Sequence, residues 1–123
     1  MKLLIVSFLL LAACAPTIQY AATSPTGDRP PRAVAEVEVL SLRPACAFTE
    51  IGMLEADSHG ADFAQTVQRM REEGARRGAD AILLTGHQAA PHHGTIQAGD
   101  HDYFASAIVL SPQCAPASAA VVR

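Results

Sequence analysis

The stretch DFAQTVQRMREEGARRGADAILL, residues 62–84, decides the fold because it reads as one helix leading directly into one buried strand. Asp62 and Gln65 match a capping box, in which each side chain satisfies a free backbone N–H group of the first helical turn. Phe63, Val67 and Met70 then recur at helical spacing. The pattern predicts an amphipathic helix over residues 62–77.

The end of that helix and the strand after it are also marked in the sequence. Gly78 is placed to end the helix in a left-handed conformation. The uninterrupted apolar run at 81–84 follows after a minimal turn and is typical of a central strand buried on both faces. We therefore expect a strand over residues 79–85.

Three more strands are expected around this unit. Residues 33–41 alternate, with Val37 and Val39 on one face, and predict a half-exposed strand near a sheet edge. Residues 48–56 change phase around Gly52, which predicts a bulge there, and residues 103–110 form the last strand. The order strand, strand, helix, strand, strand predicts a small α+β domain with one helix packed on a mixed sheet of about four strands. The second and third strands would be parallel through a right-handed crossover, and the third and fourth antiparallel.

The N-terminus reads as an export signal. Lys2 precedes an apolar segment, residues 3–13, that is shorter than the roughly 20 residues of a spanning helix. The following Leu11-Ala12-Ala13-Cys14 resembles the lipobox of bacterial lipoproteins. In that family the cysteine becomes the mature N-terminus and carries acyl chains, palmitate among them. An ordinary cleaved signal, with Cys14 lost or free, and an uncleaved anchor are the alternatives. Ala15, in place of Asp, resembles the pattern that is sorted to the outer membrane.

The chain then divides into four parts: signal peptide 1–13, lipidated N-terminus and tether 14–32, globular domain 33–114 and flexible tail 115–123. The tether contains Pro16, Pro25, Pro30 and Pro31 and has no sustained period. It would act as a spacer, reaching about 50 Å when extended.

Cysteine usage fits this division. The chain has three cysteines, so acylation of Cys14 leaves Cys46 and Cys114 as a pair. If the strands beginning near Cys46 and ending near Cys114 run antiparallel, the two residues lie at the same end of the sheet. The periplasm is oxidising, and we expect a disulfide. Two reduced, buried thiols are the alternative.

The segments Glu50-Ile51-Gly52 and ARRGADAIL, residues 75–83, resemble a family of small bacterial lipoprotein domains that includes the RcsF-like domains. The resemblance implies a non-catalytic envelope domain held at the outer membrane by its N-terminal lipid. RcsF-like domains carry two disulfides, whereas this chain can offer one.

Charge and chemistry-bearing residues narrow the function classes. The net charge is −3, and Lys2 is the only lysine, so removal of the signal gives −4. An acidic domain gives no electrostatic reason to expect nucleic acid or anionic lipid as partner. Ser58-His59 lacks the surroundings of a known catalytic motif. We expect no enzyme activity, no cofactor and no small-molecule substrate.

One histidine-rich segment leaves a second hypothesis open. His87, His92, His93 and His101, together with Asp100 and Asp102, are ligand types for zinc, nickel or copper, but their spacing matches no established site. The sequence therefore favours a lipid-anchored periplasmic domain that acts by contact with an unidentified envelope protein or cell-wall component. The alternative is a periplasmic metal-binding lipoprotein that uses the loop 87–101.

Overall fold

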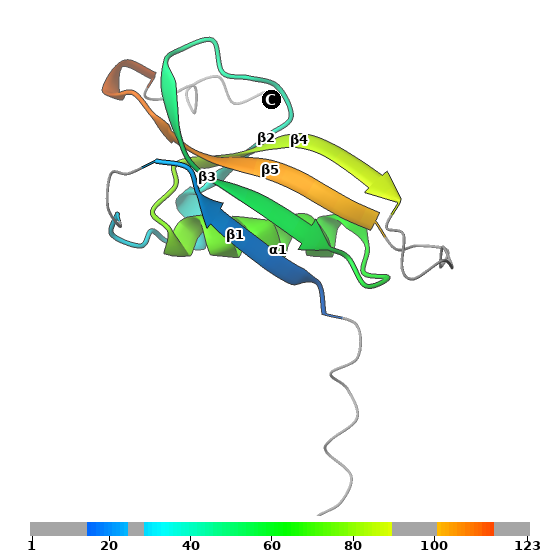
Figure 1. Ribbon diagram of the computed structural model, residues 1–123. Coiled ribbons are helices and arrows are strands. Elements are labelled where there is room, and N and C mark those ends of the chain that lie inside the picture. The colour runs from blue at the N-terminus through cyan, green and yellow to red at the C-terminus, as the bar shows by residue number, and fades with distance from the viewer. Residues whose placement is uncertain (1–14, 25–28, 90–100, 115–123) are drawn as a thin grey trace, which may run out of the picture.

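The computed structural model describes residues 15–24, 29–89 and 101–114, which form a five-stranded sheet and one long helix. The strands are β1 (Thr17–Ala22), β2 (Glu38–Leu40), β3 (Phe48–Asp57), β4 (Ala81–Ala89) and β5 (His101–Leu110). The helix is α1 (Phe63–Arg76), and two short 3-10 helices are η1 (Val34–Glu36) and η2 (Pro112–Cys114). Figure 1 shows α1 packed across one face of the sheet. The predicted α+β class is confirmed, with one strand more than expected.

The strand order in the sheet is β1-β3-β5-β4-β2. Both β3 and β4 pair antiparallel with β5. They are therefore parallel to each other, with β5 between them, and α1 connects them. The predicted antiparallel pairing of β4 with β5 is confirmed, and β2 is an edge strand, as expected.

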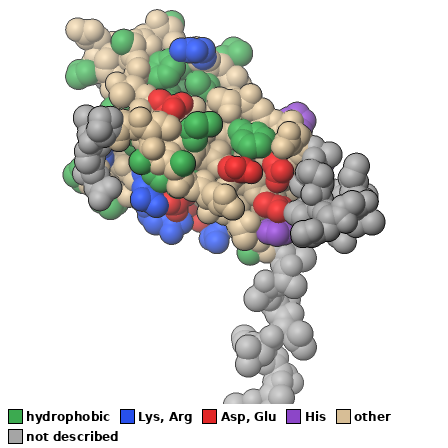
Figure 2. Space-filling model, viewed as in Figure 1, with side chains coloured by type: hydrophobic (Ala, Val, Ile, Leu, Met, Phe, Trp, Pro, Cys, Tyr) green, Lys and Arg blue, Asp and Glu red, His purple; other side chains and the backbone are tan. Residues whose placement is uncertain are grey.

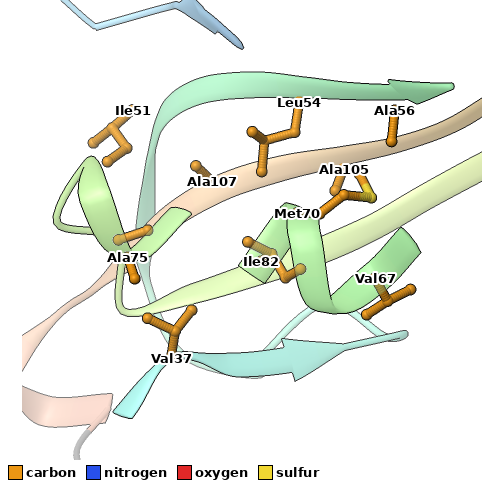
Figure 3. Close-up of a cluster of buried hydrophobic side chains, with 11 residues drawn as sticks. Val37, Ile51, Leu54, Ala56, Val67, Met70, Ala75, Ile82, Ala105 and Ala107 are labelled. Atoms are coloured by element: carbon orange, nitrogen blue, oxygen red, sulfur yellow. The ribbon is translucent and has the colours of Figure 1, made fainter. Parts of the chain in front are cut away.

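The larger core cluster lies between α1 and the sheet (Figure 3), and a smaller one of Ala81, Leu83 and Ile108 lies on the other sheet face. Leu54 of β3, Met70 of α1 and Ile82 of β4 are each less than 2% exposed. The central strand β5 contributes the small residues Ala105 and Ala107 beneath the helix. Small side chains on the central strand leave room for the large side chains of its neighbours, so the three elements interdigitate.

The local signals of the sequence act as predicted. Asp62 Oδ1 accepts from the backbone N–H of Gln65 at 2.7 Å, and the Gln65 side chain accepts from the Asp62 N–H at 3.4 Å. Gly78 follows the helix with a φ of 76°, a left-handed conformation that strains other residues. The ladder between β3 and β5 shifts register between Glu50 and Gly52, which confirms the expected bulge.

The predicted tether is wrong in its first part. Residues 17–22 form β1, which pairs antiparallel with β3 from Thr17 opposite Asp57 to Ala22 opposite Gly52. Thr17-Ile18-Gln19-Tyr20 does alternate polar and apolar residues, but the prolines on both sides hide this short pattern. The folded domain therefore begins before residue 33.

Three further boundaries differ from the expected ones. The strand predicted over 33–41 is a turn of 3-10 helix followed by the three-residue β2. The strands of the β4–β5 hairpin are longer than predicted. β4 continues past residue 85 to Ala89, and β5 begins at His101 and not at Tyr103. The signal peptide 1–13, Cys14 and the tail 115–123 lie outside the described residues. Within the described ranges, no helix is both long and apolar enough to cross a membrane.

Candidate functional site

The two ends of the sheet carry different chemistry. The end at which β1 and β5 begin and β3 and β4 finish is called here the Thr17 end, since β1 begins there at Thr17. The opposite end is called the disulfide end, since Cys46 and Cys114 lie there. Figure 1 shows these two ends on opposite sides of the molecule.

The Cys46–Cys114 disulfide is present. The two Cα atoms are 5.4 Å apart, within the range that a disulfide bridges without backbone movement. Cys46 precedes β3 and Cys114 ends η2, and the antiparallel pairing of β3 with β5 brings them together. The geometric argument from the sequence is therefore confirmed, and the bridge closes a separation of 68 residues.

An open groove of about 680 Å³ lies beside the disulfide. Leu40, Pro44 and Leu110 give it an apolar part, while Arg32 and Asp80 contribute charge. Both carboxylate oxygens of Asp80 accept hydrogen bonds. Oδ1 accepts from the Arg32 guanidinium, and Oδ2 accepts from the Leu110 N–H at 2.8 Å. These bonds join the segment before η1 to the ends of two strands, so the pair supports the groove wall.

The sheet face opposite α1 carries apolar side chains next to acidic ones. Met53 lies opposite Ser106, and Glu55 lies opposite Phe104. Alternation along the strand turns these residues away from α1, because Leu54 and Ala56 pack beneath the helix. Met53 is 51% exposed. Figure 2 shows acidic side chains beside hydrophobic ones on the visible surface.

Carboxylates lie beside the apolar side chains of this face, of which Met53 is exposed and Phe104 is partly buried. Glu50 accepts a hydrogen bond from Ser106 Oγ at 2.7 Å. Among the described residues, the ion pairs include neither Glu50, Glu55 nor Asp102. We call Glu50, Met53, Glu55 and Phe104 the open-face patch. The sequence analysis missed it, although the alternation of residues 53–56 was the signal that could have identified it.

Two of the predicted histidine ligands lie in strands and not in a loop. His87 of β4 and His101 of β5 have ring centroids 6.3 Å apart, and the Tyr103 ring lies about equally far from both, at 6.0 and 6.1 Å. His101 Nδ1 is buried and has no hydrogen-bond partner. No three described residues of ligand type come close enough to hold a metal ion. His92, His93 and Asp100 lie outside the described residues.

Ser58 and His59 serve the turn between β3 and α1. Ser58 is fully buried, and its Oγ accepts from the His101 backbone N–H at 2.9 Å. His59 has a φ of 47°, and its Nε2 lies 3.1 Å from Thr17 Oγ1. These contacts give both side chains a role in joining β1, β3 and β5 at the Thr17 end.

Comparison with known proteins gives a likeness of fold. No family model matches this chain, and no curated protein matches it. Among solved structures, the crystal structure of the Francisella virulence factor FvfA is similar, with a TM-score of 0.53 at 14% sequence identity. The alignment covers 76% of this chain and 97% of FvfA. At this identity the likeness concerns the fold alone.

Proposed function

We propose that this protein is a lipid-anchored, non-catalytic interaction domain on the periplasmic face of the outer membrane. Its anchor is Cys14, which carries acyl chains and becomes the N-terminus when residues 1–13 are removed. The sequence Leu11-Ala12-Ala13-Cys14 directly behind an apolar segment supports the anchor, and Ala15 supports the outer membrane as its location. Several acyl chains on one residue give a stable attachment where a single chain is marginal.

The observation that carries the interaction role is the open-face patch. Two sizeable apolar side chains, Met53 and Phe104, stand beside two carboxylates on a sheet face that α1 does not cover. Burial of apolar area drives association, and the carboxylates favour a partner that carries arginine or lysine near its own apolar residues. The proposed partner is therefore an envelope protein with a basic, partly apolar surface.

The anchor is tested by metabolic labelling with a fatty-acid analogue in the native host. The wild-type chain is expected to take the label and to fractionate with the outer membrane. Cys14→Ser is expected to lose the label completely, with the precursor left uncleaved or the protein released. Labelling that persists in the Cys14→Ser variant would refute the anchor.

The interaction face is tested by photo-crosslinking in cells. A photoreactive residue at Met53 is expected to give one discrete crosslinked species, because the patch is the proposed contact. The same residue at Arg76, which lies on α1 with 66% of its side chain exposed, is the matched control. Crosslinking from position 53 in a Glu55→Lys background should be weaker, since a lysine at position 55 would repel a basic partner surface. Equal products from both positions, or insensitivity to Glu55→Lys, would contradict the assignment of this face.

The second candidate function is metal binding by His87 and His101 in the hairpin of β4 and β5. The observation that favours it is the buried, unpartnered His101 Nδ1 beside His87. Calorimetry with zinc on the purified full chain would show one stoichiometric site, and His87→Ala with His101→Ala would remove it. Uptake that is absent, or unaffected by both substitutions, would exclude these two histidines as ligands.

A further inference from the structure

The chain enters the folded domain almost immediately after the proposed acylation site. Thr17 is already paired with Asp57, and Thr17 Oγ1 lies 3.1 Å from His59 Nε2. Pro16 is buried, and together with Ala15 it lines a hollow whose other residues, Ala64, Gln65, Gln68 and Arg69, belong to α1. Residues 15–17 are therefore part of the domain surface and cannot serve as a free spacer.

Covalent geometry then limits how far the domain can stand from the lipid. Two peptide units separate Cys14 from Pro16, and each extended residue spans at most about 3.6 Å, so the two Cα atoms lie within about 7 Å of each other. A free tether to residue 32 would have allowed about 50 Å. Acylation of Cys14 would thus place the Thr17 end of the sheet at the membrane surface.

The side chains at that end suit a lipid–water boundary. Phe63 is the first residue of α1, next to the Ala64 and Gln65 that border Pro16, and it is 53% exposed. Its ring contacts Tyr103 at a centroid distance of 5.5 Å. Aromatic rings are enriched where apolar acyl chains meet the wet headgroup region. Asp57, Asp62 and Asp102 also lie at this end, so the surface fits a zwitterionic membrane better than an anionic one.

We propose that the Thr17 end of the domain rests directly on the membrane surface, with the Phe63 side chain in contact with lipid. This inference rests on the proposed lipid anchor at Cys14. The disulfide end then points away from the membrane, together with the exposed Gln113 of η2 and the groove beside Cys46. The open-face patch lies between the two ends, accessible from the side.

The test uses the absence of tryptophan from the natural chain, which gives two single-tryptophan variants without background emission. Phe63→Trp reports on the Thr17 end, and Gln113→Trp, at an exposed position next to Cys114, reports on the disulfide end. The full-length, acylated protein is reconstituted into phosphatidylcholine vesicles whose acyl chains carry bromine near the headgroups. Bromine quenches tryptophan fluorescence only on contact. Phe63→Trp is expected to lose most of its emission relative to unbrominated vesicles, and Gln113→Trp is expected to lose none.

A spacer variant separates attachment from contact. A flexible Gly-Ser insert of about ten residues after Ala15 adds a root-mean-square reach of about 17 Å and leaves the residues up to Ala15 unchanged. It is expected to restore most of the Phe63→Trp emission while the chain stays acylated and folded. Unchanged thermal unfolding by circular dichroism checks the fold of each variant.

The outcomes distinguish the two proposals. A chain that takes no fatty-acid label removes both the anchor and the membrane contact. A labelled chain in which both tryptophans keep their emission, or lose it equally, refutes the membrane contact and leaves the anchor standing. Quenching that survives the spacer would show that Phe63 contacts lipid by its own affinity, so the short link would not be what holds it there.

Discussion

Gly52 of β3 lies against the ring of Tyr20 of β1 so closely that a Cβ atom at position 52 would collide with the ring. Tyr20 also donates from its hydroxyl to the Ile51 carbonyl oxygen at 3.1 Å, and the Arg77 guanidinium lies 4.4 Å from the ring centroid. The bulge in β3 thus creates the place where β1 is fixed. The same contact holds residues 17–22 in the sheet, so this segment is part of the domain and not the expected tether.

Gly52→Ala is expected to destabilise the protein by about 1–3 kcal/mol, because the added methyl group must displace the Tyr20 ring. Chemical denaturation of the full chain measures the change. Gly86→Ala is the matched control, since a Cβ there meets no atom within 4 Å. In a Tyr20→Ala background the cost of Gly52→Ala should largely disappear. A full cost in that background would show that the ring is not the obstacle.

Loss of the disulfide is expected to lower the free energy of unfolding by roughly 4 kcal/mol in the chain-entropy model, because Cys46 and Cys114 are 68 residues apart. Cys46→Ser with Cys114→Ser is compared with the wild type in thermal unfolding. Reductant should lower the Tm of the wild type towards that of the variant and leave the variant unchanged. Identical melting of the two proteins without reductant would contradict a stabilising bridge.

Asp80→Ala is expected to cost about 1–3 kcal/mol, because the Leu110 N–H and the Arg32 guanidinium both lose their acceptor in a partly buried position. Glu72→Gln serves as the control, since its pair with Arg69 is a surface contact and its loss should stay within about 0.5 kcal/mol. Urea unfolding of both variants gives the comparison. Similar costs for the two would show that Asp80 is no more than a surface charge.

Asp62→Ala is expected to destabilise the protein by about 1 kcal/mol, because the Gln65 N–H loses its acceptor at the start of α1. Asp62→Ser keeps a capping oxygen and should recover most of that loss. Equal destabilisation by alanine and serine would mean that the carboxylate acts through its charge and not through the hydrogen bond.

The sequence by itself determined the parts whose signals are local. The capping box at Asp62, the apolar face of α1 and Gly78 fix the helix, because caps and helical period act within a few residues of one another. The run at 81–84 marked a buried inner strand for the same reason, although β5 and not β4 is at the centre of the sheet. The Cys46–Cys114 pairing also followed, since an odd cysteine and the strand directions restrict the choice.

Only the tertiary structure decided the role of residues 15–24 and the character of the open face. The sequence of β1 is too short for its alternation to predict a strand. It forms a strand because it pairs with the edge of the bulged β3, where Gly52 leaves space for the Tyr20 ring. Likewise, the sequence shows Met53 and Glu55, but their neighbours Ser106 and Phe104 come from a strand about 50 residues away. Pairing between distant segments sets such contacts, and no local pattern encodes the register.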